Sequence, residues 1–415
     1  MKITFIANAC AIYESDSFRL LSDPWLIDGA FDGAWFHYPK VKTTPGDLRD
    51  VDAIYISHLH PDHYCKLSLS SFPRDIPIIY LKHGKNYLHN MLKRDGWKNL
   101  IAIGDGETKA VGPFNITMYK PWCLNPWADS SLGNLIDSCM VLEADGHKIL
   151  NTNDCTPTLA GCVDLREKHG QFDIAQIQFN AAGPYPSCFN GLGWRESEKV
   201  KERNLKYMVL MALVLRPKLV HPFSGAYIIG GKNWHKNKTL GTTTAQDAAR
   251  YLIDRDIDPL HLMEGESYDL SSKYKVPDVK PSSRDEMMAY ASTLKDRRYS
   301  YEEMGQDLPN FDALFDKSRK SFADICAMNL IDCRVDINGR IAYKPIWDTR
   351  NHLRASIDER LLYMIMNFNA HWNNAEIGCH VEFDRTGKYI PDVHTLLSFL
   401  HVKTFGQNII ENICP

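Results

Sequence analysis

Four side chains that commonly bind metal ions lie close together near the start of the chain. The stretch His-Leu-His-Pro-Asp-His places His58, His60, Asp62 and His63 within six residues. Imidazole and carboxylate groups suit zinc or iron. His58 and His60 are two residues apart, so their side chains point to the same side of an extended chain, and the proline turns Asp62 and His63 toward a second position. These residues predict a metal site, with Asp62 as both ligand and catalytic group.

The segment ahead of this cluster indicates how it is held. A chance group of surface histidines is the alternative, because 16 of the 415 residues are histidine. However, the run Ala53-Ile-Tyr-Ile56 is short, apolar and rich in strand formers, as expected for a buried strand. Such a strand delivers the histidines into a loop at the edge of a sheet. A metal site is therefore the favoured interpretation.

The cluster resembles the His-X-His-X-Asp-His signature of the metallo-β-lactamase superfamily. This resemblance implies an α/β fold, a four-layered αββα sandwich with the metal site at one edge of its two sheets. It also implies that later strand ends supply Asp154 as a bridging, catalytic aspartate and His221 as the last ligand. A carboxylate suits the bridging position because it can bind two metals, or one metal and a water. A loop-capping aspartate and a buried structural histidine are the alternatives.

One ligand of the superfamily pattern is missing from this sequence. The loop ahead of the expected strand Ser138–Glu143 contains no histidine, so Asn134 or Asp137 would have to substitute. An amide is a poor ligand for zinc. Either the site holds one metal firmly and a second weakly or not at all, or a carboxylate gives it a harder, iron-like character.

Other side chains are candidates for contacting a substrate. Trp25 lies in a loop rich in aromatic residues and glycine, which forms either a pocket wall or a cap on the core. His235 is a weaker candidate, and the neighbouring Lys232 and Lys236 could balance a phosphate, although a solvated basic loop is the alternative. Asp23 is as consistent with a turn as with a contact to a metal-bound histidine.

The length of the chain and its composition suggest two domains. We expect a metal domain over residues 1–275 and a smaller α+β accessory domain over 285–415, separated by a segment rich in proline and polar residues. In the accessory domain, Asn338-Gly339 predicts a hairpin turn. Its histidines at 371, 380 and 394 show no ligand spacing and are expected to be structural.

Composition limits the partners and the compartment. A net charge of −3 with 24% charged residues gives no basic field for nucleic acid. No segment approaches the length of a membrane span. The eleven scattered cysteines fit a reducing compartment, so we expect a cytoplasmic protein. A small-molecule substrate is expected, and the oligomeric state is left open.

Two later segments sharpen the resemblance. The runs Gly146-His-Lys-Ile-Leu-Asn-Thr-Asn-Asp-Cys155 and Pro222-Phe-Ser-Gly-Ala-Tyr227 are similar to the catalytic region of the CMP-N-acetylneuraminate hydroxylases and their bacterial relatives. That family implies a non-haem iron monooxygenase that receives electrons through a Rieske domain. No cysteine here has a histidine two residues on, so we expect no Rieske centre in this chain and a separate electron-transfer protein as partner.

Three functional hypotheses follow. The first, slightly favoured, is a non-haem iron oxygenase or hydroxylase with one or two iron ions, acting on a sugar nucleotide or related small metabolite. The second is a zinc- or manganese-dependent hydrolase of a phosphodiester, lactone or amide, in which Asp154 orients a hydroxide formed on the metal. The third is a binding protein with a degenerate metal site, and the five or six intact ligands argue against it.

Overall fold

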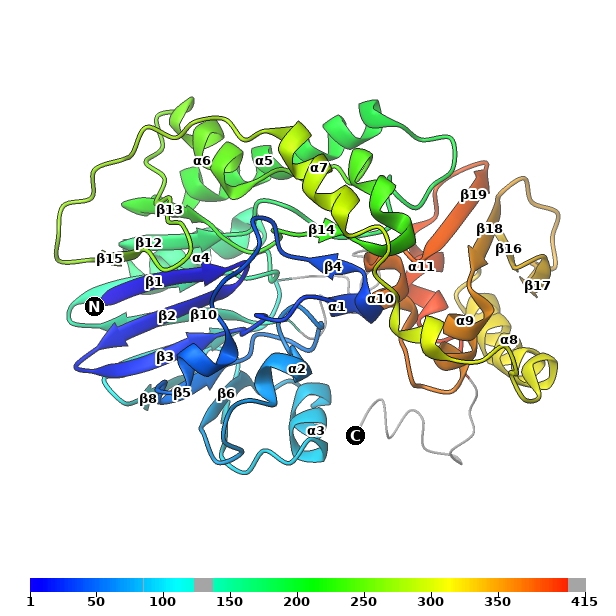
Figure 1. Cartoon of the computed structure of the whole chain (residues 1–415), viewed down its shortest axis with the longest axis horizontal. Helices are drawn as coiled ribbons and strands as arrows, with labels where there is room; N and C mark the ends of the chain where they lie inside the picture. The colour runs from blue at the N-terminus through cyan, green and yellow to red at the C-terminus, as the bar shows by residue number, and fades with distance from the viewer. Residues whose placement is uncertain (85, 123–136, 402–415) are drawn as a thin grey trace.

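A seven-stranded sheet forms the first half of a sandwich (Figure 1). The computed structural model describes residues 1–84, 86–122 and 137–401. Strands β3, β5, β6 and β7 run parallel, and β15, β1 and β2 extend the sheet in antiparallel fashion. The strand order is β15 (Ser267–Asp269), β1 (Lys2–Ala7), β2 (Cys10–Ser15), β3 (Phe18–Ser22), β5 (Ala53–Tyr55), β6 (Ile78–Leu81) and β7 (Leu100–Ile103).

A six-stranded sheet forms the second half. Strands β11, β12 and β13 are parallel, whereas β10, β9 and β8 continue the sheet in antiparallel pairs. The order is β13 (Leu219–Pro222), β12 (Ile174–Ile177), β11 (His147–Asn151), β10 (Cys139–Ala144), β9 (Phe114–Tyr119) and β8 (Thr108–Val111).

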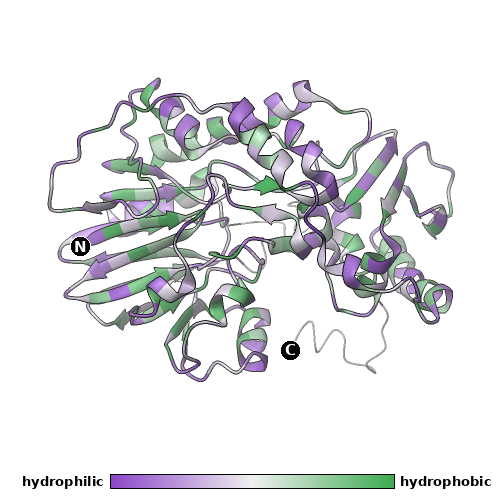
Figure 2. Cartoon of the chain, viewed as in Figure 1, coloured by the Kyte–Doolittle hydropathy of each residue, from purple (hydrophilic) through white to green (hydrophobic). Residues whose placement is uncertain are grey.

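Alternating side chains explain why the two sheets stack. Successive residues of a strand face opposite sides, so an apolar strand can bury both. In β5, Ala53 and Tyr55 join one buried cluster with residues of the second sheet, such as Met140 and Ile149. Ile54 faces the other side, with helices α2 (Lys66–Leu69) and α3 (Tyr87–Arg94). Figure 2 shows apolar residues along the strands of both sheets.

Helices cover the outer face of the second sheet as well. Leu150 and Ala175 pack in a cluster with apolar residues of three helices, namely α4 (Leu159–His169), α5 (Trp194–Leu215) and α6 (Ala245–Ile253). The layers are therefore helix, sheet, sheet and helix. The αββα sandwich expected from the sequence is confirmed.

The C-terminal part of the chain builds a smaller unit beside the sandwich (Figure 1). Its four-stranded sheet has the order β17 (Arg340–Tyr343), β16 (Arg334–Ile337), β18 (His352–Ile357) and β19 (Val381–Thr386). The predicted turn at Asn338-Gly339 joins β16 to β17. The helices of this part are α7 (Arg284–Thr293), α8 (Phe311–Met328), α9 (Glu359–Met366), α10 (Trp372–Ile377) and α11 (Pro391–Leu397).

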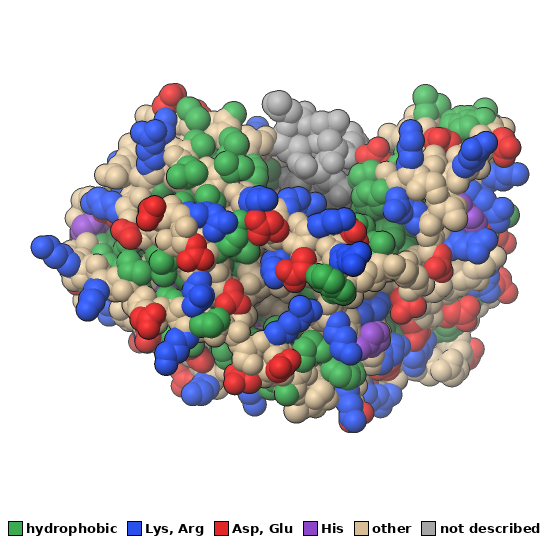
Figure 3. All heavy atoms as spheres, turned by 90° about the horizontal axis from the view of Figure 1, so that it is seen from above, with side chains coloured by type: hydrophobic (Ala, Val, Ile, Leu, Met, Phe, Trp, Pro, Cys, Tyr) green, Lys and Arg blue, Asp and Glu red, His purple; other side chains and the backbone are tan. Residues whose placement is uncertain are grey.

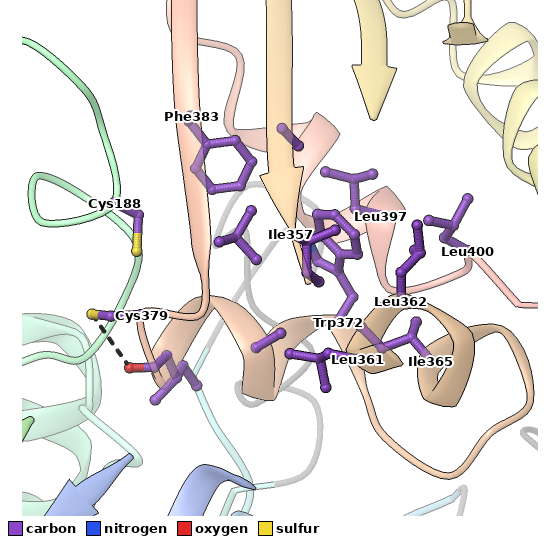
Figure 4. Close-up of a cluster of buried hydrophobic side chains, with 14 of the residues drawn as sticks. Cys188, Ile357, Leu361, Leu362, Ile365, Trp372, Cys379, Phe383, Leu397 and Leu400 are labelled. Carbon is purple, nitrogen blue, oxygen red and sulfur yellow. Dashed lines mark hydrogen bonds between the residues drawn. The ribbon is translucent and has the colours of Figure 1, made fainter. Parts of the chain in front are cut away.

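One hydrophobic cluster joins this unit to loops of the sandwich. Trp372 is fully buried, and Figure 4 shows it among side chains of α9, α11 and β18. The same cluster includes Trp25 and Trp35 from the N-terminal part. The backbone N–H of Phe383 in β19 donates to the carbonyl of Cys188, which lies in the loop after β12, at 2.7 Å. The two predicted domains therefore share a core, and their boundary stays a prediction.

Two segments differ from the sequence expectation. The apolar run Lys2–Tyr13 predicts one strand, but the chain reverses at Asn8, whose φ of 49° lies in the left-handed region that asparagine tolerates, and forms β1 and β2. The residues of Glu376–Phe383 also predict a strand, but the first of them complete α10 before β19 begins. Three short elements lie between the sandwich and the C-terminal unit (Figure 1). They are α1 (Ala30–Gly33), β4 (Trp35–Phe36) and β14 (Ile228–Ile229).

Among the described residues, no helix is both long enough and apolar enough to cross a membrane.

Candidate metal centre

The candidate ligands come from strand ends that meet at one edge of the sandwich. Strands β3 and β5 are parallel, so the loops that follow them leave the first sheet on the same side. Strands β11, β12 and β13 are parallel in the second sheet. Strand β10 runs against β11, so the residue just before β10 lies at the end where β11 finishes. This topology brings Asp23, the histidine cluster, Asp137 and Asp154 together.

A buried aspartate organises the histidine loop. Asp23 is fully buried, and its Oδ1 accepts a hydrogen bond from the backbone N–H of Ser57 at 2.8 Å. Its Oδ2 accepts from Ser57 Oγ at 2.7 Å and lies 2.9 Å from Nδ1 of His63. A carboxylate only accepts, so it holds the proton of His63 on Nδ1 and leaves Nε2 to face the site. Asp23 is thus more than a turn residue.

The same serine orients a second histidine. Ser57 Oγ donates to Asp23 and lies 3.0 Å from Nδ1 of His58. Because that hydroxyl proton is engaged, the oxygen accepts from His58 Nδ1–H, and the lone pair of His58 Nε2 points to the centre of the site. One carboxylate therefore fixes two ring tautomers, directly at His63 and through Ser57 at His58.

Two groups of donor atoms are arranged to hold a metal ion. His58, His60 and Asp137 each offer one atom within 4.8 Å of the others, and so do His58, His63 and Asp154. Within the first group, Nε2 of His58 is 2.9 Å from Nδ1 of His60 and 3.7 Å from Oδ1 of Asp137. Each group contains two imidazoles and one carboxylate.

Asp62 lies next to the second group. Its Oδ2 is 3.3 Å from Nε2 of His63, and Oδ2 of Asp154 is 3.5 Å from the same nitrogen. Asn8, from the turn between β1 and β2, donates to Asp62 Oδ2 at 3.2 Å and orients it. Three carboxylates and three imidazoles thus surround one small volume.

Buried atoms without partners show that these residues fit a metal ion. Nε2 of His63 and Oδ1 of Asp137 are buried and have no hydrogen-bond partner. Leaving such atoms unpaired is unfavourable unless something else binds them. Burial, followed by the charge of Asp154, raises the pKa of Asp137 well above its ordinary value. Burial and the neighbouring His63 and His60 lower the pKa of His58 well below its usual range.

A cation would satisfy all of these groups. Neutral imidazoles and ionised carboxylates are the protonation states in which these side chains bind metals. Burial by itself disfavours the ionised form of Asp137, and a bound cation would stabilise that form. The donor set of nitrogen and oxygen suits iron, zinc or manganese. The structure supports a metal cofactor without selecting the element.

Asp154 is the most exposed member of the site. The side chains of His58, His63, Asp62 and Asp137 are at most 4% exposed, whereas that of Asp154 is 21% exposed. Its Oδ1 accepts from Nε2 of Gln178 at 2.9 Å and from the hydroxyl of Ser224. Solvent therefore reaches the site at this carboxylate.

The C-terminal unit contributes a contact that the sequence did not reveal. Oδ1 of Asn373 in α10 lies 3.0 Å from Nε2 of His60. Because an amide oxygen accepts, it holds a proton on that nitrogen and leaves Nδ1 of His60 facing His58. His371, expected to be structural, is also near: burial, followed by the charge of His60, lowers its pKa to about 4. No short-range motif marks these two residues.

Besides Asp62, three of the predicted site residues that the structure describes lie outside the two donor groups. His221 is buried at the end of β13, with Nδ1 3.3 Å from Nε2 of Gln176, and its role as a ligand stays a prediction. Trp25 is fully buried against His37 and Trp35. His235 is exposed and near the carbonyl of Lys232. Asn134 lies outside the described residues.

The accessory histidines at 380 and 394 make internal contacts. His380 Nε2 is 2.9 Å from the carbonyl of Phe31, and its Nδ1 is 3.2 Å from the Tyr301 hydroxyl. His394 Nδ1 is 2.7 Å from the buried carboxylate of Glu376. These contacts lie within the shared core and agree with the structural roles expected for them.

The sequence of the chain is similar to curated hydroxylases. No protein-family model matches the chain. It is 30% identical over 246 residues to the cytidine monophosphate-N-acetylneuraminic acid hydroxylase of Danio rerio, a match that covers 54% of this chain and 38% of the relative. It is 28% identical over 303 residues to the hydroxylase of Pongo pygmaeus, covering 67% of this chain and 48% of the relative. The chain is a distant homologue of these hydroxylases.

The match spans less than half the length of either relative. Among solved structures, an isothiocyanate hydrolase from Delia radicum gut bacteria has a TM-score of 0.49 at 16% identity, covering 65% of this chain and 99% of that one. CmlA, a diiron beta-hydroxylase from Streptomyces venezuelae, has a TM-score of 0.46 at 14% identity, covering 64% and 53%. Its relatives by sequence, its αββα fold and its site place the chain among metal-dependent enzymes of the metallo-β-lactamase fold.

Proposed function

We propose that the chain is the catalytic part of a non-haem iron hydroxylase that acts on a sugar nucleotide or a related small metabolite and takes electrons from a separate protein. The observation that carries the proposal is the composition of the two donor groups. Each combines two histidines with one carboxylate, the set that non-haem iron oxygenases use. The sequence relatives, whose name specifies hydroxylation of a sugar nucleotide, support the same class of reaction.

Asp137 is central to this proposal. It is one of the two residues, with Asn134, that could stand where the superfamily pattern has a histidine, and it would replace a neutral nitrogen ligand by a negative oxygen ligand. Oxygen donors favour harder ions, so the exchange moves the site away from a zinc preference. One or two iron ions bound here would supply the activation of dioxygen. The two positions share His58: His58, His60 and Asp137 would hold an ion at one, and His58, His63 and Asp154, with Asp62 beside them, would hold an ion at the other.

The chain's own groups supply orientation and access. Asp23 and Asn373 hold the protons of His63 and His60 away from the site, so that both rings present a lone pair. Burial of these ligands keeps bulk water out, which limits loss of reactive species to solvent. Asp154, partly exposed, faces the side from which a substrate can arrive.

Hydrolysis is the second candidate, and the same donor set favours it. Two histidines and one carboxylate also hold catalytic zinc in hydrolases, where the metal lowers the pKa of bound water to about 7. In this alternative Asp154, with an exposed edge, orients the attacking hydroxide on a phosphodiester, lactone or amide. Manganese would support the same chemistry.

Metal content and dioxygen use separate the two candidates. The protein is expressed without added metal and its metals are counted by plasma mass spectrometry. It is then loaded with ferrous iron without oxygen, reduced chemically, and exposed to isotopically labelled dioxygen with CMP-N-acetylneuraminic acid. Bound iron and a product carrying one labelled oxygen atom are expected. Stoichiometric zinc that survives dialysis, with no labelled product, would refute the oxygenase.

Two substitutions at one position sharpen the test. Asp137→His restores a histidine and is expected to shift the preference from iron toward zinc. Asp137→Asn keeps the shape and removes the charge, so it is expected to weaken binding of both metals. If both variants bind iron as the parent does, Asp137 is not a ligand.

A further inference from the structure

A cleft of about 650 Å³ lies between α5 and the loops that follow β11 and β12. One stripe of α5 forms a wall, because residues three or four apart lie on the same helix face. The opposite stripe, including Met208 and Ala212, is buried in the helix–sheet cluster. The wall residues on α5 are Lys199, Glu202, Arg203, Asn204, Lys206, Tyr207 and Leu210.

The charges on this wall favour an anion. Three of its four charged side chains are basic, namely Lys199, Arg203 and Lys206. Lys199 pairs with Glu196 at 2.8 Å, and Lys206 pairs with Glu202 at 3.4 Å. Arg203 makes no ion pair with any residue that the structure describes, and a guanidinium can bind a carboxylate or a phosphate through two parallel hydrogen bonds.

The face seen in Figure 3 carries no broad basic region. Seen from above, the surface carries basic and acidic side chains mixed over the whole visible face (Figure 3). Such a face does not suit an extended polyanion or a membrane surface, which need a broad basic region. A small anion that fits between α5 and the neighbouring loops suits this charge distribution better.

Polar groups in the cleft add hydrogen-bonding capacity. Nδ2 of Asn204 is buried and has no hydrogen-bond partner among the described residues. Thr156 Oγ1 donates to Oε1 of Gln178 at 3.0 Å and keeps its oxygen as an acceptor. Phe179 and Leu210 give apolar surface beside these groups. A ligand with charged, polar and apolar parts would find a partner for each.

The cleft adjoins the candidate metal centre. Gln178 lines the cleft, and its Nε2 donates to Oδ1 of Asp154 at 2.9 Å. Thr156 lines it as well and lies two residues after Asp154. A molecule in the cleft would therefore lie beside a residue that contacts Asp154, the most exposed member of the site.

We propose that this cleft binds the anionic part of the substrate, with Arg203 as its main charged partner, and directs the remainder of the molecule toward Asp154. The class of ligand is a small organic anion, either a phosphate ester or a carboxylate, that also carries hydroxyl groups. The reaction at the metal rests on the proposed function, whereas binding of the anion does not require it.

Calorimetric titration of the full-length protein tests this proposal. The probes are cytidine 5′-monophosphate, N-acetylneuraminic acid and uncharged cytidine, and the variants are Arg203→Gln and Arg203→Lys. Arg195→Gln is the matched control, because Arg195 lies on the same helix, is exposed and is not among the wall residues. Arg203 is exposed, so its substitution is expected to leave folding intact, which thermal melting verifies.

At least one anion should bind the parent more tightly than cytidine does. Arg203→Gln should weaken that affinity by about tenfold, as expected for loss of a charge-assisted contact. Arg195→Gln should leave the affinity unchanged, and Arg203→Lys should retain part of it. If only the nucleotide binds, the anionic group that the cleft recognises is a phosphate. If only the sugar acid binds, that group is a carboxylate.

Three outcomes would overturn the proposal: neither anion binds at millimolar concentration, cytidine binds equally well, or both glutamine variants weaken binding equally. Failure of the proposed hydroxylation looks different. The labelled-oxygen product would then be absent while anion binding still depended on Arg203. Conversely, if the protein hydroxylated its substrate and Arg203→Gln left KM unchanged, the proposed function would stand. The proposed role of the cleft in substrate binding would then be refuted.

Discussion

Substitution of Asp23 by asparagine should weaken metal binding while preserving the fold. The carboxylate accepts from the Ser57 N–H, from the Ser57 hydroxyl and from His63. An asparagine of the same shape can accept from the backbone N–H, but its amide then presents hydrogens to Nδ1 of His63. That nitrogen must become an acceptor, so the proton of the ring moves to Nε2. The nitrogen that faces the metal site is thereby blocked.

The expected magnitude follows from these contacts. A neighbour that orients a metal-binding histidine contributes about 10- to 100-fold in metal affinity, and a change of tautomer places the loss at the upper end. Because the amide keeps the volume and at least one hydrogen bond, the protein should lose only about 1–3 kcal/mol of stability. Asp23→Ala leaves all three donors unpaired in a fully buried position and should be much less stable.

The assay is competition for metal with a chelator of known affinity, alongside urea unfolding of the metal-free proteins. Asp28→Asn is the matched control, because Asp28 makes a similar contact, 2.7 Å from Nδ1 of His37, outside the metal site. Wild-type metal affinity in Asp23→Asn would refute the tautomer argument. So would an equal loss of metal in Asp28→Asn, since that would trace the effect to general destabilisation.

Three further substitutions test other parts of the structure. Asn373→Leu removes the acceptor of His60 and should weaken metal affinity about tenfold or more, whereas Asn373→Asp should not; equilibrium dialysis compares them. Trp372→Ala empties a fully buried site and should lower the free energy of unfolding in urea by about 3–5 kcal/mol, and a value below about 1 kcal/mol would contradict the shared core. Burial lowers the pKa of His380 to about 4. The stability of the folded state with a neutral His380 ring is therefore fully present above the unfolded pKa near 6.5 and is lost as the pH falls toward 4. His380→Gln should therefore reduce the loss of stability between pH 7 and pH 5 by about 2 kcal/mol, and an unchanged loss would contradict a buried neutral ring.

The sequence predicted the features that depend on local pattern. The apolar run before His58 forms β5, and the sandwich follows from strands whose two faces are both apolar. Asp154 follows β11 at the strand end where the resemblance to the superfamily expects it, and its role as a bridging ligand stays a prediction. The reversal at Asn8 was missed, because an apolar run shows no break in hydrophobicity where the backbone turns.

Features that depend on distant parts of the chain could not be predicted. Asn134 and Asp137 were equal substitutes in the sequence, and the structure places Asp137, two residues before β10, beside His58. Asn373 is separated from His60 by 313 residues, and nothing around it resembles a ligand motif. A contact of that kind is set by packing of the C-terminal unit.

The two sides of the metal centre differ, and this difference suggests a division of labour between the two parts of the chain. On one side, α10 brings Asn373 against His60 and is anchored by Trp372 in the shared core, so the C-terminal unit fixes a ligand. On the other side, Gln178 connects Asp154 to a basic cleft, and no residue of the C-terminal unit lines that cleft among the described residues. A substitution in α10 should therefore change metal affinity more than substrate affinity, whereas one on α5 should do the reverse. If substitutions on either side changed both affinities equally, the two functions would not be separable in this way.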